Sequence, residues 1–104
     1  MADNTGAAVK RVQKMEKLFD KAKAAESKLR KAAGEYEKLL SDIGKLREYY
    51  TGQDWKNDFQ ADEEGGFPSE LKRGVLSEDG IWNFLEDSRE LAEELKELSE
   101  KMIV

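Results

Sequence analysis

The residues best suited to chemistry form an acidic cluster in the second half of the chain, at Asp54, Asp58, Asp62, Glu63 and Glu64. The three aspartates are spaced four apart, which places them along one edge of a short helix, where like charges repel. A nearby positive charge should therefore offset them. Ion pairs with Lys72 and Arg73, across the turn that follows, are the explanation that we favour, because structural ion pairs are the common cause of such clusters.

The same carboxylates allow a second interpretation, a site for a hard divalent cation. Calcium and magnesium prefer carboxylate and carbonyl oxygens, and the candidate ligands Asp58, Asp62 and Glu63 come just before the flexible pair Gly65-Gly66. The spacing does not match an EF-hand loop, so our main expectation is no metal and no cofactor. Binding of a small ligand or a divalent cation by residues 54–79 stays as an alternative function.

An enzymatic function is disfavoured by composition, since the sequence contains neither histidine nor cysteine. The commonest general base, the imidazole metal ligand and the thiol nucleophile are all missing, and no disulfide can form. Catalysis would depend on carboxylates, lysine, tyrosine or serine. No phosphate-binding glycine loop or nucleophile elbow occurs. We therefore expect that the protein is not an enzyme.

Aromatic side chains gather around the acidic cluster. Six of the nine lie within residues 49–82, at Tyr49, Tyr50, Trp55, Phe59, Phe67 and Trp82. Trp55 and Phe59 are four residues apart, so both rings share one face of a helix. A small secondary core that anchors an irregular segment is the favoured interpretation. A binding pocket or an exposed interaction site is the alternative.

Charge is distributed unevenly along the 104 residues. Residues 1–50 carry 12 Lys and Arg against 8 Asp and Glu, a net charge of +4, whereas residues 51–104 carry 6 against 15, a net charge of −9. The stretch 7–31 alone nets +6, with 9 basic and 3 acidic residues. Nucleic-acid binding by this basic helix is a third possible function, but the charges go round the helix rather than along one face. We expect the two halves to attract each other or a partner instead.

A heptad pattern over residues 7–50 predicts one long helix. Two interleaved series of apolar or aromatic residues form its seam: Met15, Ala22, Leu29, Tyr36, Ile43, Tyr50, and Leu18, Ala25, Ala32, Leu39, Leu46. Residues 51–76 read as an irregular segment with short helices. Thr51 and Asp54 have the spacing of a capping box at the start of the first short helix, and Gly65-Gly66 is expected to end it. Residues 78–103 repeat the three-four apolar spacing of a helix, and Ser77 is placed to cap it.

The two long helices are expected to pack antiparallel, as a helical hairpin or a three-helix bundle within a single domain, 1–104. The last helix is too short to cover the first, which leaves a stripe exposed at Val9, Val12, Met15, Leu18 and Phe19. A break of the first helix near Gly34 would cover it, and so would a second copy of the chain. In an antiparallel pair g positions face each other, and Asp87 and Glu94 suit the basic g positions of the first helix better than the acidic ones. The g positions of the first helix are Lys14, Lys21, Lys28, Glu35 and Asp42.

The segment 62–79, DEEGGFPSELKRGVLSED, resembles a family of small bacterial helical proteins that is known as a domain of unknown function. The likeness extends over most of the chain: a heptad-rich first helix, two tyrosines at its end, this segment, and an aromatic-rich last helix. It implies a short helical protein and no particular activity.

These observations together predict an all-α protein that acts as a non-enzymatic protein–protein interaction module, such as an adaptor, inhibitor or assembly component. The partner would be another protein or a second copy in a homodimer, with no membrane and no nucleic acid involved. The sequence shows no signal peptide and no apolar run of about 20 residues, so the expected location is the cytoplasm. The predicted interaction surface consists of Val9, Val12, Met15, Leu18, Phe19, Trp55, Phe59, Lys72 and Arg73.

Overall fold

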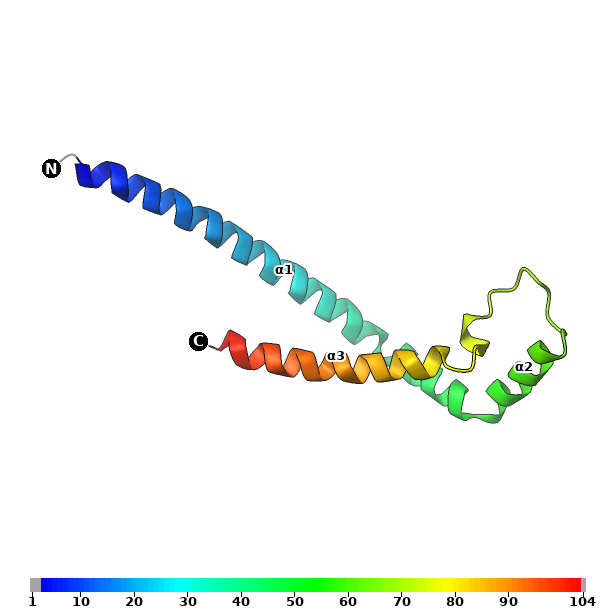
Figure 1. Cartoon of the computed structure of the whole chain (residues 1–104). Helices are drawn as coiled ribbons and strands as arrows, with labels where there is room; N and C mark the ends of the chain where they lie inside the picture. The colour runs from blue at the N-terminus through cyan, green and yellow to red at the C-terminus, as the bar shows by residue number, and fades with distance from the viewer. Residues whose placement is uncertain (1–2, 104) are drawn as a thin grey trace. The chain divides into compact units, whose positions relative to one another are not determined.

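The computed structural model describes residues 3–103, and every regular element in them is a helix (Figure 1). In chain order these are α1 (Asp3–Thr51), α2 (Gln53–Glu63), the short 3-10 helix η1 (Gly74–Leu76) and α3 (Gly80–Met102). The predicted all-α class is confirmed: a long N-terminal helix is in contact with the other two. The chain divides into two compact units, Met1–Leu40 and Ser41–Val104, which are described separately.

The first unit is the helical stretch of α1 up to Leu40. Helix α1 is continuous through Gly34 and Gly44, so the break near Gly34 that would have made a three-helix bundle does not occur. Each glycine costs a helix about 1 kcal/mol, which a helix of 49 residues with an apolar seam tolerates. A Cβ at either position would meet nothing within 4 Å, so neither glycine serves a close contact.

The second unit begins with the end of α1 and a sharp break before α2. Thr51 belongs to the last turn of α1, and its hydroxyl donates a hydrogen bond of 2.9 Å to the Arg47 carbonyl. The predicted capping box with Asp54 was therefore wrong. The N-cap of α2 is Gly52, whose backbone is extended and whose amide donates to the Tyr49 carbonyl at 3.1 Å. A Cβ at Gly52 would lie only 3.0 Å from a backbone oxygen of α1, so glycine suits this break.

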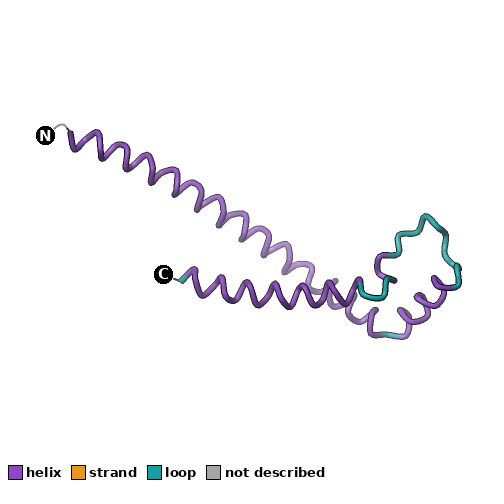
Figure 2. The backbone as a smooth tube through the Cα atoms, viewed as in Figure 1, coloured by secondary structure: helices purple, strands orange, loops and turns teal. Residues whose placement is uncertain are grey.

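Helix α2 ends in a Schellman motif made by the predicted glycine pair. The Gly66 amide donates to the Ala61 carbonyl at 2.9 Å, and the Gly65 amide donates to the Asp62 carbonyl at 3.0 Å. Gly65 has a φ of 75°, the left-handed conformation that this motif needs and that glycine adopts without strain. The chain then runs through an irregular segment to η1 (Figure 2).

The core of the second unit is small. Among the described residues only Leu76, at 6% exposed, and Ile81, at 5%, are buried. Leu76 lies in η1, which contacts both α2 and α3, so this short helix joins the two longer ones.

Ser77 links η1 to the start of α3. Its hydroxyl donates to the Gly74 carbonyl at 2.9 Å and accepts a hydrogen bond from the Gly80 amide at 3.1 Å. Ser77 thus bonds an amide at the helix start, but it is not the N-cap that the sequence predicted: the helix begins at Gly80, and its N-cap is Asp79. The helices of the described residues do not include one with the length and apolar content needed to cross a bilayer.

Candidate functional site

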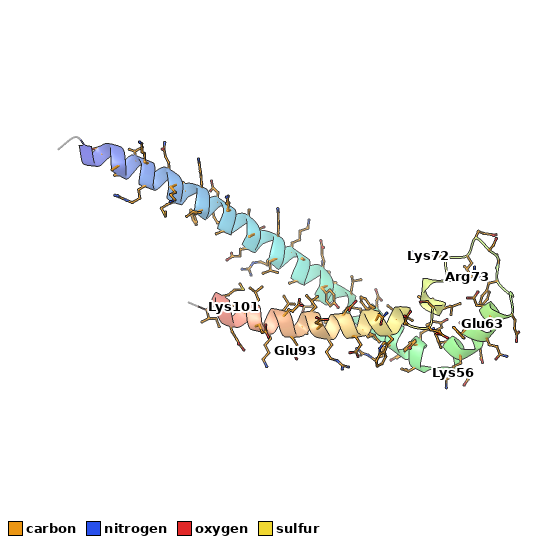
Figure 3. All side chains as sticks on the ribbon, in the orientation of Figure 1. Lys56, Glu63, Lys72, Arg73, Glu93 and Lys101 are labelled. Atoms are coloured by element: carbon orange, nitrogen blue, oxygen red, sulfur yellow. The ribbon has the colours of Figure 1, made fainter. Side chains whose placement is uncertain are left out.

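The predicted stripe on α1 is open to solvent in the first unit. Its five members, which we call the N-terminal seam, are between 49% and 57% exposed: Val9, Val12, Met15, Leu18 and Phe19. The Lys23 ammonium group lies 4.1 Å from the centre of the Phe19 ring, a cation–π contact within the same helix. Side chains project from all sides of this part of α1 (Figure 3). The seam is thus an apolar surface flanked by positive charge.

The basic residues around the N-terminal seam are solvated. Asp20 pairs with Lys23 at 3.8 Å and Glu26 pairs with Arg30 at 3.7 Å, and all four side chains are at least 59% exposed. Such pairs within one helix contribute about 0.3–0.5 kcal/mol each. The excess positive charge of this segment is therefore free to act on a partner.

The aromatic residues that were candidates for a surface have an internal role in the second unit. The rings of Tyr50 and Trp55 meet edge to face at 5.0 Å, and those of Trp55 and Phe59 stack at 5.1 Å. The indole nitrogen of Trp55 donates a hydrogen bond of 2.8 Å to the Val75 carbonyl, just before the buried Leu76. Trp55 and Phe59 are half-buried. These rings anchor the irregular segment, which is the interpretation that we favoured from the sequence.

The acidic cluster is divided between two different contacts. Arg73 donates to Asp62 at 2.6 Å, and their side chains are 33% and 26% exposed, so the expected ion pair across the turn is present. The Tyr49 hydroxyl donates to Asp58 at 2.7 Å. Burial, together with this hydrogen bond and the negative charges of Asp58 and Asp54, raises the pKa of Tyr49 to about 12.

The structure does not bring the metal-ligand candidates together. Within residues 3–103 no group of three or more acidic side chains is placed to hold a metal ion. Asp58 and Asp62 are engaged as just described, and Glu63 is exposed at the end of α2. Lys72 is exposed and makes no ion pair in the described structure, in contrast with its neighbour Arg73 (Figure 3).

A second exposed stripe lies on α3, and the sequence interpretation had assigned it to internal packing. Its members, which we call the C-terminal seam, are between 41% and 56% exposed: Leu91, Leu95, Leu98 and Met102. The three-four spacing was visible in the sequence, but its exposure was not. Leu71, Val75 and Trp82, also outside the predicted surface, are 42–53% exposed. These three residues follow no helical spacing in the sequence, so their exposure could not be predicted from it and is seen only in the structure.

The fold and its exposed seams define a class: an all-α protein whose helices carry apolar faces that its small core leaves exposed to solvent. The chain belongs to the family described as a domain of unknown function, DUF4298, whose profile matches residues 12–98. The resemblance expected from segment 62–79 is thereby confirmed. No curated protein and no solved structure gives a significant match to the chain.

Proposed function

We propose that the protein is a non-enzymatic protein–protein interaction module whose docking surface is the N-terminal seam. The observation that carries the proposal is the exposure of five large apolar side chains near the start of one helix, each about half open to water. Contiguous apolar surface of this kind marks interaction sites in soluble proteins, since leaving it in water is unfavourable.

The length of α3 supports the need for a separate partner. Helix α3 starts beside the end of α1, where the Tyr50 hydroxyl donates to the Glu78 carbonyl at 3.4 Å. Its 23 residues extend about 34 Å at 1.5 Å per residue. Leu18 is 32 residues before Tyr50 in the same continuous helix, about 48 Å away by the same rise. Helix α3 is thus too short to cover the seam of its own chain in any direction.

The proposal is tested by photocrosslinking in the native cell. A photoreactive amino acid at position 18 lies in the seam, and one at position 13, on the face of α1 that points away from Met15, Leu18 and Phe19, is the matched control. We expect a defined protein adduct from position 18 and none from position 13. Equal yields from the two positions would contradict the proposal.

The proposal extends to the cytoplasmic location expected from the sequence, which cell fractionation tests. Cation binding by residues 54–79 and nucleic-acid binding by the basic half receive no specific support from the contacts described above.

A further inference from the structure

We propose that the occupant of the N-terminal seam is helix α3 of a second copy of this chain, docked antiparallel through its C-terminal seam. This inference rests on the proposed function, since it names the partner of the same surface. Both seams are apolar and exposed. The three-four spacing of coiled-coil helices runs through Met15, Leu18 and Ala22 on α1 and through all four residues of the C-terminal seam on α3.

Charges at the edges of the seams disfavour closure of the hairpin within one chain. The contact between Tyr50 and Glu78 sets the register that such a hairpin would have. In that register the g positions facing each other would be Glu35 with Glu94, Asp42 with Asp87, and Lys28 with Lys101. All three pairs are of like charge, which opposes the pairing.

The same carboxylates match the basic part of α1. Setting Leu95 opposite Leu18 in an antiparallel pair brings Glu94 beside Lys21 and Asp87 beside Lys28. These four charged side chains are exposed, and none makes an ion pair in the described structure. Each is therefore available to a partner.

The apolar positions agree with this register. It sets Met15 opposite Leu98 and Ala22 opposite Leu91, so these layers, like that of Leu18 and Leu95, are apolar on both helices. Its single like-charge pair, Lys14 with Lys101, falls at the last turn of α3. A shift of one heptad toward the N-terminus keeps two opposite-charge pairs but buries Arg11 against Leu95, which is costly.

Charge also selects the orientation and the identity of the partner helix. In a parallel pair g faces e, and the e positions of α3 are uncharged: Leu85, Ala92 and Ser99. Two N-terminal seams pairing with each other would bring together two segments of net charge +6, whereas α3 carries 7 acidic and 3 basic residues, a net charge of −4. Antiparallel α3 is thus the complementary partner on this chain.

The absence of cysteine allows a direct test by crosslinking with the purified full chain. A tagged Leu18→Cys variant is mixed with an untagged Leu95→Cys variant and treated with a short thiol crosslinker. We expect a mixed covalent dimer as the main product. A main product that joins two Leu18→Cys chains, or an internal crosslink in the double variant, would overturn the proposal.

Sedimentation equilibrium provides the second measurement. We expect a dimer whose dissociation constant rises about fivefold with Glu94→Lys and is restored by adding Lys21→Glu. Glu93→Lys, the same change one residue away at an outward-facing f position (Figure 3), should leave it unchanged. Equal effects of Glu94→Lys and Glu93→Lys on the dissociation constant would refute the inference. A wild-type protein that stays monomeric at about 100 µM would refute it as well. A monomer that still forms the position-18 adduct in cells would refute only the identity of the partner, not the proposed function.

Discussion

Replacing Tyr49 by phenylalanine tests the contact that joins the end of α1 to α2. The change keeps the ring and removes the hydroxyl that donates to Asp58 at 2.7 Å. A rise of the Tyr49 pKa from 10.0 to about 12 corresponds to at most about 2.7 kcal/mol. Because both groups are partly exposed, solvent screening reduces this. We expect Tyr49→Phe to lower the free energy of unfolding by about 1.5 kcal/mol, the lower end for a hydrogen bond to a charged group.

The same contact makes stability depend on pH in the alkaline range. The pKa of Tyr49 is higher in the folded than in the unfolded protein, so folding holds the phenolic proton more tightly. The stabilisation is complete below pH 10 and is lost as the pH rises through about 12. Tyr49→Phe should remove this dependence, since it has no proton to lose.

Urea unfolding followed by circular dichroism, at pH 7 and at pH 11, measures both effects. Tyr49→Phe, Asp58→Asn and the double variant form a thermodynamic cycle in which the two changes should be clearly non-additive. An absorbance titration of wild type minus Tyr49→Phe isolates this tyrosine. A midpoint near 10 in the folded protein, or additive single changes, would show that the hydroxyl does not bond Asp58.

Three further predictions concern the second unit and the glycines. Gly80→Ala should destabilise by about 1–3 kcal/mol, because its Cβ would lie 2.8 Å from a backbone oxygen of η1 and against the Ser77 hydroxyl. An unchanged urea midpoint would contradict this. Arg73→Ala should cost about 1 kcal/mol through the lost ion pair, whereas the adjacent Lys72→Ala should stay within about 0.5 kcal/mol; equal losses would argue against the pair. Gly65→Ala should destabilise by about 1 kcal/mol because of its positive φ, while Gly34→Ala should stabilise by about 0.5–1 kcal/mol; helix content and thermal midpoints of both variants measure this.

The sequence was sufficient for the features that depend on local periodicity. The heptads predicted the long helix and the exposed stripe at Leu18, since a helix brings residues three and four apart to one face. Charge proximity across a short turn predicted the pair of Asp62 with Arg73. The glycine pair after α2 predicted its end, because the left-handed φ of Gly65 closes a Schellman motif.

Features that depend on long-range geometry were not predictable in this way. The bond from Tyr49 to Asp58 requires the break at Gly52 between α1 and α2, and the bond from Trp55 to the Val75 carbonyl requires the chain to turn back after Gly65. No local pattern encodes either path. The capping box at Thr51 failed because the helix continued one residue further, through Thr51, whose hydroxyl bonds the Arg47 carbonyl behind it. The exposure of the C-terminal seam was missed because the spacing of apolar residues tells which face is apolar, not what covers it.

Among the residues whose burial is described, only Leu76 and Ile81 form the core, and this small core has a consequence for the heat of unfolding. The heat-capacity change on unfolding scales with the apolar surface newly exposed to water, and globular domains average about 12–15 cal/mol/K per residue. A single copy of this chain hides little such surface, so its value per residue should be well below that range and its melting broad. Docking of the seams would add the missing buried surface, so calorimetry at rising protein concentration should show a larger heat-capacity change, a sharper transition and a higher melting temperature.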